Sequence, residues 1–105
     1  MVMTGRNSMI EFEWDHEKAE RNLRKHGVGF VEAATVLRDS LGITIFDPDH
    51  SLDEDRYVTV GMSSQGRAVM VAHTDRADAI RIISARELTR AERKAYEEEM
   101  QRRAK

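Results

Sequence analysis

The segment Arg81-Ile82-Ile83-Ser84-Ala85-Arg86 decides the fold that we expect for this chain. Its β-branched and apolar residues are typical of a strand enclosed by other structure. Simple strand alternation places Arg81 on one face of the sheet, and Ser84 and Arg86 on the other. A guanidinium is rarely buried without an anion, so we expect each arginine to meet a carboxylate of the protein or a phosphate of a ligand.

Three more strands are predicted before this segment, at residues 43–46, 57–62 and 68–74. Turn-forming residues at 63–66 and 75–78 join the later strands to one another. Consecutive strands connected by such short loops should pair antiparallel as a meander, because a parallel pair needs a long crossover.

A short strand at residues 10–14 and two helices precede the meander. Asp15 is a suitable N-cap and Gly27 a suitable C′ residue for the first helix, and the second helix is predicted at 30–37. A capping box at 89–92 starts a third helix. The sequence therefore predicts an α+β domain of order β-α-α-β-β-β-β-α, with the two N-terminal helices packed on a central antiparallel sheet and a C-terminal helix.

The first helix offers only a narrow apolar stripe. Ala19, Leu23 and His26 recur at helical spacing, whereas most of the other positions are charged. We expect this stripe to contact the protein and the basic side to face outward. The pair Lys25-His26 at the helix end is favoured by the helix dipole, whatever else it does.

Composition bounds the class of protein. The chain has 105 residues, no cysteine and a net charge of −2, which indicate one domain without disulfides or cysteine-based metal sites. It has no apolar run long enough to span a bilayer and no signal-peptide core, so a cytoplasmic location is expected. Residues 1–8 are polar and patternless and predict a disordered leader before a single domain at 9–105.

The modest net charge conceals an uneven distribution. Residues 39–62 carry six acids against one arginine, whereas residues 63–86 carry four arginines against two acids. We therefore expect an acidic loop region beside a basic end of the sheet.

Several polar side chains are predicted to gather where the strands end on the open side of the sheet. They are Glu54, Arg56, His73, Arg81, Ser84 and Arg86. The four histidines have no His-x-x-x-His spacing, so neither a metal site nor another cofactor is expected. Cleavage of RNA without a metal needs a base, an acid and cations that stabilise the charge on phosphorus. Glu54, His26 or His73 are candidates for proton transfer, and the arginines for holding the phosphate, although a plain binding domain with structurally paired arginines remains the alternative.

Motifs spread over residues 10–99 resemble the BrnT family of bacterial toxins. They are Phe12-Glu13-Trp14-Asp15, Lys18-Ala19, Asn22, Lys25-His26-Gly27-Val28, Phe30, Ala33, Glu54, Arg56, Gly61, Arg67, Val71-Ala72-His73-Thr74, Arg81-Ile82-Ile83-Ser84-Ala85-Arg86, Glu92-Arg93 and Tyr96. This resemblance implies a RelE/ParE-like fold and a metal-independent ribonuclease that arrests translation. It also implies neutralisation by a BrnA-type antitoxin with a ribbon-helix-helix domain, and binding of operator DNA only by the toxin–antitoxin complex.

The same resemblance points to candidate site residues. Lys25, His26, Glu54, Arg56, Arg81 and Arg86 are the expected catalytic residues, and His73, Ser84 and Arg67 the expected substrate contacts. Two alternatives remain: a ParE-like toxin that acts on a protein such as DNA gyrase and cleaves nothing, and a module that only holds the antitoxin. The acidic stretch at residues 47–55 suits an interaction surface better than an RNA path.

Overall fold

The structure is a computed structural model that describes residues 2–4 and 10–104. Its helices are α1 (His16–His26), α2 (Phe30–Val36) and α3 (Arg90–Arg103), with a short 3-10 helix, η1, at Pro48–His50. Its strands are β1 (Val2–Thr4), β2 (Glu11–Glu13), β3 (Ile43–Phe46), β4 (Arg56–Met62), β5 (Ala68–Arg76) and β6 (Ala79–Glu87). The predicted order of elements is present, and β1 and η1 are added to it.

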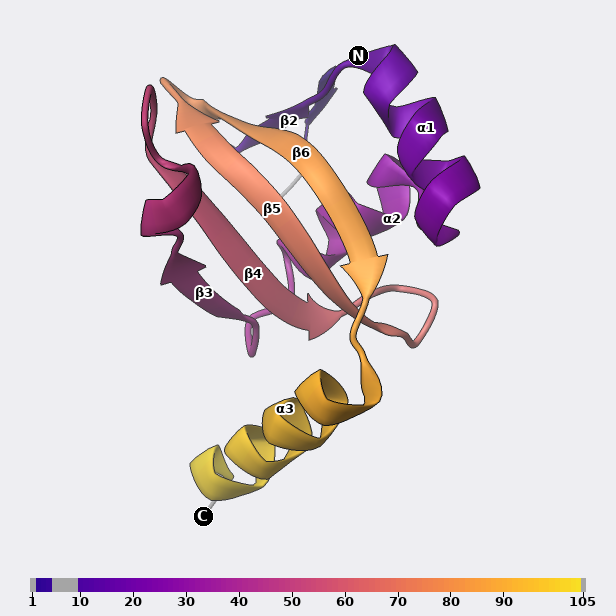
Figure 1. Ribbon diagram of the computed structural model, residues 1–105, viewed down its shortest axis with the longest axis vertical. Coiled ribbons are helices and arrows are strands. Elements are labelled where there is room, and N and C mark those ends of the chain that lie inside the picture. Colours follow the sequence, from indigo (N-terminus) through magenta and orange to yellow (C-terminus); the bar gives the residue numbers. More distant parts are fainter. Residues whose placement is uncertain (1, 5–9, 105) are drawn as a thin grey trace.

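The strands form one mixed sheet in the order β1-β2-β6-β5-β4-β3 (Figure 1). β3 to β6 are the predicted antiparallel meander, in which Val58 pairs with Ala72 and Thr59 with Val71. β2, however, pairs parallel with β6. The prediction of a wholly antiparallel sheet is therefore wrong, because the chain between β2 and β6 is itself the long connection that a parallel pair requires.

The N-terminal segment differs from the expected leader where the structure describes it. Residues 2–4 form β1, which pairs antiparallel with β2 and extends the sheet beyond it. A strand added there covers the backbone groups of β2 that would otherwise form an open edge. Residues 1 and 5–8 of the predicted leader lie outside the described residues, and the division into a leader and a domain stays a prediction.

The caps read from the sequence are confirmed. The Asp15 carboxylate accepts hydrogen bonds from the backbone N–H groups of Glu17 at 2.9 Å and Lys18 at 3.1 Å. Gly27 ends α1 with φ of 71°, a left-handed conformation that suits glycine. Thr89 and Glu92 form the capping box of α3. These local signals therefore fix where two of the helices begin and where α1 ends.

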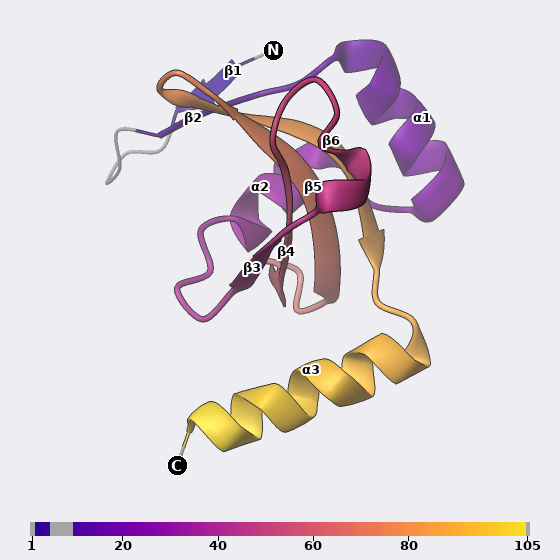
Figure 2. The ribbon, with the colours of Figure 1, turned by 60° about the vertical axis from the view of Figure 1, so that its left-hand side comes forward.

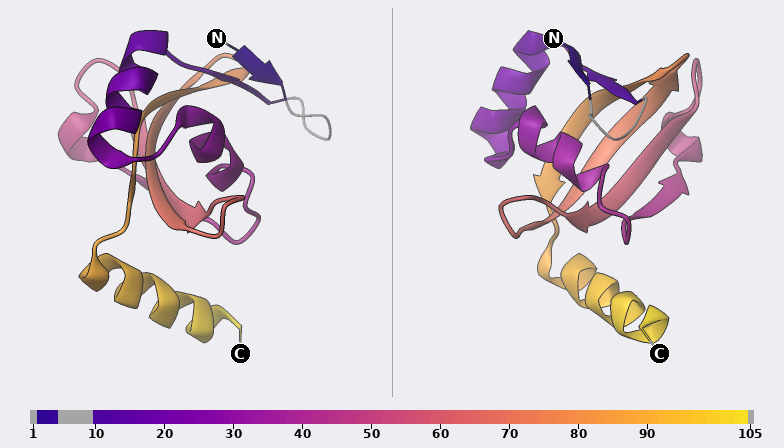
Figure 3. Two further views of the ribbon diagram at one scale, coloured as in Figure 1. Left: turned by 90° about the vertical axis from the view of Figure 1, so that its right-hand side faces the viewer. Right: turned by 180° about the vertical axis from the view of Figure 1, so that it is seen from behind.

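The hydrophobic core lies between the sheet and the helices α1 and α2. α2 covers one face, as the view from behind shows (Figure 3), and α1 lies along β6. The buried residues of this core are Phe12, Trp14, Val28, Phe30, Ala33, Ala34, Val36, Val69, Val71, Ile82 and Ala85. The opposite face, which we call the open face, is turned to the viewer in Figure 1.

α3 lies at one end of the open face, apart from the other two helices (Figure 2). Its Tyr96 is buried and lines a shallow pocket together with Ile43, Val60 and Met70 of the sheet. No helix in residues 2–4 and 10–104 is long and apolar enough to cross a membrane.

Candidate active site

An irregularity in β6 decides which side chains share the open face. Ala72 pairs with Ser84, but the next residue of β5, His73, pairs with Ile82, so Ile83 is skipped. Ile82 and Ala85 consequently both face the core, with 2% and 1% of their surfaces exposed. A β-bulge of this kind shifts the alternation by one residue. Arg81 therefore faces the same side as Ser84 and Arg86, whereas simple alternation had separated them.

A shallow hollow on the open face collects several of the predicted residues. Its lining is His26, Val58, Met70, Ala72, Ser84, Ala85 and Arg86. Val58, Ala72 and Ser84 lie in one cross-strand row, and Met70 and Arg86 are partners in another. The hollow thus has a small, apolar floor, with an imidazole, a hydroxyl and a guanidinium around it.

Arg86 is held in place by a carboxylate of α3. Its two terminal nitrogens donate to the two oxygens of Glu92, at 2.7 and 3.0 Å, and one also donates to the backbone oxygen of Glu87 at 3.2 Å. The hydrogen bond from Arg86 is the main cause that lowers the pKa of Glu92 to about 2. The same bond raises the pKa of Arg86, against the opposing effect of burial. Glu92 also caps α3, so it fixes this guanidinium relative to the helix.

α1 reaches the hollow because a buried amide ties it to β6. The Asn22 side chain donates to the backbone oxygens of Val28 at 2.9 Å and Ala85 at 2.8 Å, and accepts from the Ala85 N–H at 3.1 Å. Leu23, by contrast, is 54% exposed. The predicted contact stripe is therefore wrong at Leu23 only, because Ala19 packs against the core and His26 lines the hollow. A fully satisfied buried amide replaces the leucine as the anchor.

This orientation turns part of the basic side of α1 toward the sheet. A second shallow pocket, the α1 groove, adjoins the hollow and shares His26 and Ser84 with it. Its lining is Lys18, Arg21, Asn22, Lys25, His26, Ile83 and Ser84. Lys25 and His26 are thus close to Ser84, as the site prediction requires.

Arg56 and Arg81 occupy the next part of the open face. Both are cross-strand partners of Thr74, so they lie in one row on strands β4 and β6. Arg81 is 3.7 Å from a carboxylate oxygen of Glu13, the acidic partner that a half-buried guanidinium was expected to have. Four residues along β4 separate the row of Arg56 from the row of Arg86, which is about 13 Å at the usual rise of a strand.

Glu54 lies in an acidic surrounding, away from the hollow. Its pocket is lined by Asp49, His50, Leu52, Asp53, Glu54 and Arg56. Its carboxylate is 3.8 Å from Arg76 of β5, which links this pocket to the turn between β5 and β6. Two of the predicted catalytic residues, Glu54 and Arg56, thus line a pocket that also contains Asp49 and Asp53.

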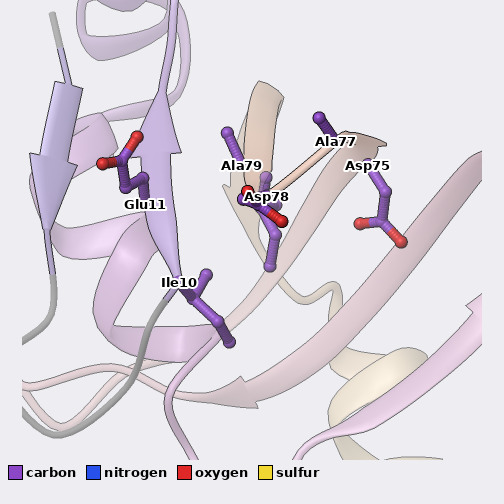
Figure 4. Close-up of a pocket in the computed structure, with 7 residues that line it drawn as sticks. Ile10, Glu11, Asp75, Ala77, Asp78 and Ala79 are labelled. Atoms are coloured by element: carbon purple, nitrogen blue, oxygen red, sulfur yellow. The ribbon is translucent and has the colours of Figure 1, made fainter.

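A further pocket at the β5–β6 turn is also acidic. Figure 4 shows Glu11, Asp75 and Asp78 around the starts of β2 and β6, together with Ile10 and Ala79. We call these residues, together with Asp49, Asp53 and Glu54, the acidic end of the sheet. Carboxylates repel phosphate, so this end does not suit an RNA backbone.

His73 does not reach the open face, and this part of the site prediction is corrected. It is 5% exposed, alternates with the core residues Val69 and Val71, and shares a hydrogen bond of 2.7 Å with Thr59. Its ring stacks on Tyr57 with centroids 5.9 Å apart. Burial lowers the pKa of His73, which favours a neutral side chain in the core.

Arg67 is likewise engaged within the protein. It forms a bidentate pair with the buried carboxylate of Glu32, and donates to Glu87 at 3.3 Å and to the backbone oxygen of Gly27 at 3.0 Å. The hydrogen bond from Arg67 lowers the pKa of Glu32, although burial opposes the shift. These contacts join α1, α2, β5 and β6, so the position of Arg67 is that of a structural residue.

The residues described at 2–4 and 10–104 include no group of three His, Asp or Glu side chains that could hold a metal ion. Metal-independent chemistry stays a prediction.

Comparison with known proteins identifies the family. A family model described as the ribonuclease toxin BrnT of type II toxin–antitoxin systems matches residues 14–92. The chain belongs to the BrnT family. The crystal structure of the Brucella abortus ribonuclease toxin BrnT is similar in fold, with a TM-score of 0.58 and 22% identity over 79% of this chain and 100% of that one. No curated protein sequence matches the chain.

As a member of this family, the chain is a type II toxin with an antitoxin partner and an RNA target. Two features of the candidate site were missed in the sequence: the role of Glu92 in holding Arg86 and that of Asn22 in orienting α1. A signal existed for Glu92, because the capping box identified it as a helix-capping residue. Its contact with Arg86 depends on the path of the chain between β6 and α3, which local patterns do not specify.

Proposed function

We propose that the protein is a metal-independent endoribonuclease and that RNA is cleaved in the hollow. One observation carries the proposal: in a member of a ribonuclease toxin family, an imidazole, a hydroxyl and a guanidinium line the same hollow of the open face. These are the side-chain types that cleavage of a phosphodiester without a metal requires.

The reaction begins when the ribose 2′-hydroxyl attacks the adjacent phosphorus. A bond forms between the 2′-oxygen and phosphorus, and the bond to the leaving 5′-oxygen breaks. The proton of the 2′-hydroxyl passes to a base, and an acid or water supplies a proton to the 5′-oxygen, which leaves as a 5′-hydroxyl. His26 transfers a proton, as base or as acid, because imidazole does both near neutral pH. Arg86 and Lys25 stabilise the negative charge on the phosphate oxygens, and Ser84 binds the substrate.

Arg56 and Arg81 hold a neighbouring phosphate, because they share one row of the open face beyond the hollow. Glu54 is the alternative group for proton transfer. Its place among the acids of the pocket beside η1, and its contact with Arg76, favour His26 over it. His73 and Arg67 do not contact the RNA in this proposal. They stabilise the fold, His73 through Thr59 and Arg67 through Glu32.

The cellular role follows the family. We propose a RelE-like fold, arrest of translation in the cytoplasm through RNA cleavage, and neutralisation by a BrnA-type antitoxin with a ribbon-helix-helix domain. The toxin–antitoxin complex would be the form that binds operator DNA, since the toxin has a net charge of −2 and an acidic end.

The test is cleavage of a defined RNA by the purified protein, with the chemical nature of the new ends determined. We expect a 2′,3′-cyclic phosphate or 3′-phosphate on one fragment and a 5′-hydroxyl on the other, with activity retained in a strong chelator. RNA with a 2′-deoxy sugar at the cut site should be inert. Ends with a 5′-phosphate, or loss of activity with the chelator, would show a metal-dependent nuclease instead.

A further inference from the structure

The cationic side of α1 extends beyond the residues assigned to cleavage. Lys18, Arg21 and Lys25 follow at intervals of three and four residues, so they lie on one side of the helix. All three line the α1 groove, which joins the hollow at His26 and Ser84. The acids of α1, Glu17 and Glu20, are not part of this lining.

The three cations repel one another along the helix. Like charges at these spacings destabilise a helix by about 0.2–0.5 kcal/mol per pair. Lys18 also lies in the first turn, where the helix dipole disfavours a cation. Within the described residues, none of the three is within 4.0 Å of a carboxylate oxygen. Asp15 attracts Lys18 at longer range, and Glu17 precedes Arg21 by four residues, so part of the cost is offset within the helix.

An ordinary solvated surface explains some of these charges. Arg24, for example, is exposed, points away from the groove by helical spacing, and needs no ligand. Lys25 is favoured by the dipole at the end of α1. Lys18 and Arg21 are exposed as well, but unlike Arg24 they line a groove that leads directly into the proposed cleavage site.

We infer that the α1 groove binds the backbone of single-stranded RNA next to the cleaved nucleotide, and that Lys18 and Arg21 contact its phosphates. This inference rests on the proposed function. Lys18 and Lys25 are separated by about 10 Å along the helix axis, enough for a short stretch of backbone. We expect the bound RNA to be single-stranded, because a base can reach the apolar floor of the hollow only when it is unpaired.

Arg21 and Arg24 provide a matched pair for the test. Binding is measured by fluorescence anisotropy with a short 2′-O-methylated oligouridine, which has no free 2′-hydroxyl for cleavage, at several salt concentrations. We expect Arg21→Gln to lower the slope of log affinity against log salt by about 0.7, the value for one phosphate contact on a single strand. That is about a fivefold loss of affinity at 0.1 M salt. Arg24→Gln should match the wild type.

Cleavage of unmodified RNA separates this inference from the proposed function. We expect Arg21→Gln to lower kcat/KM by raising KM, with kcat unchanged, since the residue lies outside the hollow. Equal salt slopes for Arg21→Gln and Arg24→Gln, or no binding of the oligouridine by the wild type, would overturn the inference while leaving cleavage in place. Binding that depends on Arg21, without cleavage of any RNA, would instead overturn the proposed function alone.

Discussion

The α1 side and the acidic end of the same sheet differ in how their charges are arranged. The α1 groove and the hollow contain Lys18, Arg21, Lys25, His26 and Arg86, of which only Arg86 has a carboxylate partner among the described residues. At the acidic end, carboxylates outnumber cations in both pockets.

This difference shows that the average charge of the chain says little about its ligand. A phosphate backbone is attracted where cations outnumber carboxylates, and is repelled where carboxylates gather. Arg56 lies between the two regions, since it lines a pocket of the acidic end and shares a row with Arg81. The boundary between substrate surface and acidic surface therefore crosses the open face near this row.

The largest effect should come from the proton-transfer group. We expect His26→Ala to reduce cleavage by about 10²–10⁴-fold, the usual contribution of general acid–base catalysis. Glu54→Gln should reduce it less than about tenfold, because Glu54 lies at the acidic end and not in the hollow. Single-turnover cleavage of one RNA at saturating enzyme measures both. If Glu54→Gln were the more damaging variant, the acidic end would contain the catalytic base.

A second pair of variants separates structural from substrate-binding arginines. Arg67→Ala leaves the Glu32 carboxylate, 5% exposed, without its partner and should lower the free energy of unfolding by about 3 kcal/mol. Arg86→Ala leaves Glu92, 34% exposed, in contact with water and should cost far less stability while impairing cleavage.

Denaturant unfolding and cleavage per folded molecule should be measured on both variants. Replacing Glu32 by Gln in the Arg67→Ala background should restore part of the lost stability, since the unpaired charge is then absent. A large loss of stability in Arg86→Ala, with cleavage per folded molecule unchanged, would make Arg86 structural as well.

Sequence patterns predicted the order of the elements because caps, turns and strand periodicity are local. Which side chains of β6 share a face was not predictable in this way. The stretch Ile82-Ile83 gives no sign of a bulge, and the skipped residue appears only once β5 and β6 are paired. The parallel pairing of β2 also depends on residues far apart in the sequence, since Phe12 of β2 pairs with Ile80 of β6.

His73 and α1 show two different kinds of error. The position of His73 was predictable, because alternation with the apolar Val69 and Val71 already indicates the core face. The orientation of α1 was not, since Asn22 is polar and is buried only because backbone groups of Val28 and Ala85 satisfy its amide. Residue types therefore indicated the chemistry of the site, whereas its geometry depends on pairings between distant segments.

A smaller effect concerns the pH dependence of stability at the hollow. The pKa of Glu92 in the folded state, about 2, is below the ordinary glutamate value of 4.5. Its ionised form therefore contributes stability above about pH 4.5, and this contribution is lost as the pH falls toward 2. We expect Glu92→Gln, which keeps a residue suited to the capping box, to show a weaker fall of Tm over this range than the wild type. Glu97 is exposed in the same helix, and the Tm of Glu97→Gln should fall with pH as that of the wild type does.

The smallest expected effect is at the acidic end itself. Asp49 and Asp53 line the pocket that contains Glu54 and Arg56, and neither is a proposed RNA contact. Both are exposed, and salt at physiological ionic strength weakens the interactions of exposed charges, so Asp49→Asn with Asp53→Asn should change RNA affinity by less than about twofold. At low salt the double variant should bind slightly more tightly, because a repulsive field has been reduced. Anisotropy with the 2′-O-methylated oligouridine at low and physiological salt measures this change. A strong loss of binding or cleavage would mean that these carboxylates contact the substrate or recruit a cation for it, and the contrast between the two ends of the sheet would no longer hold.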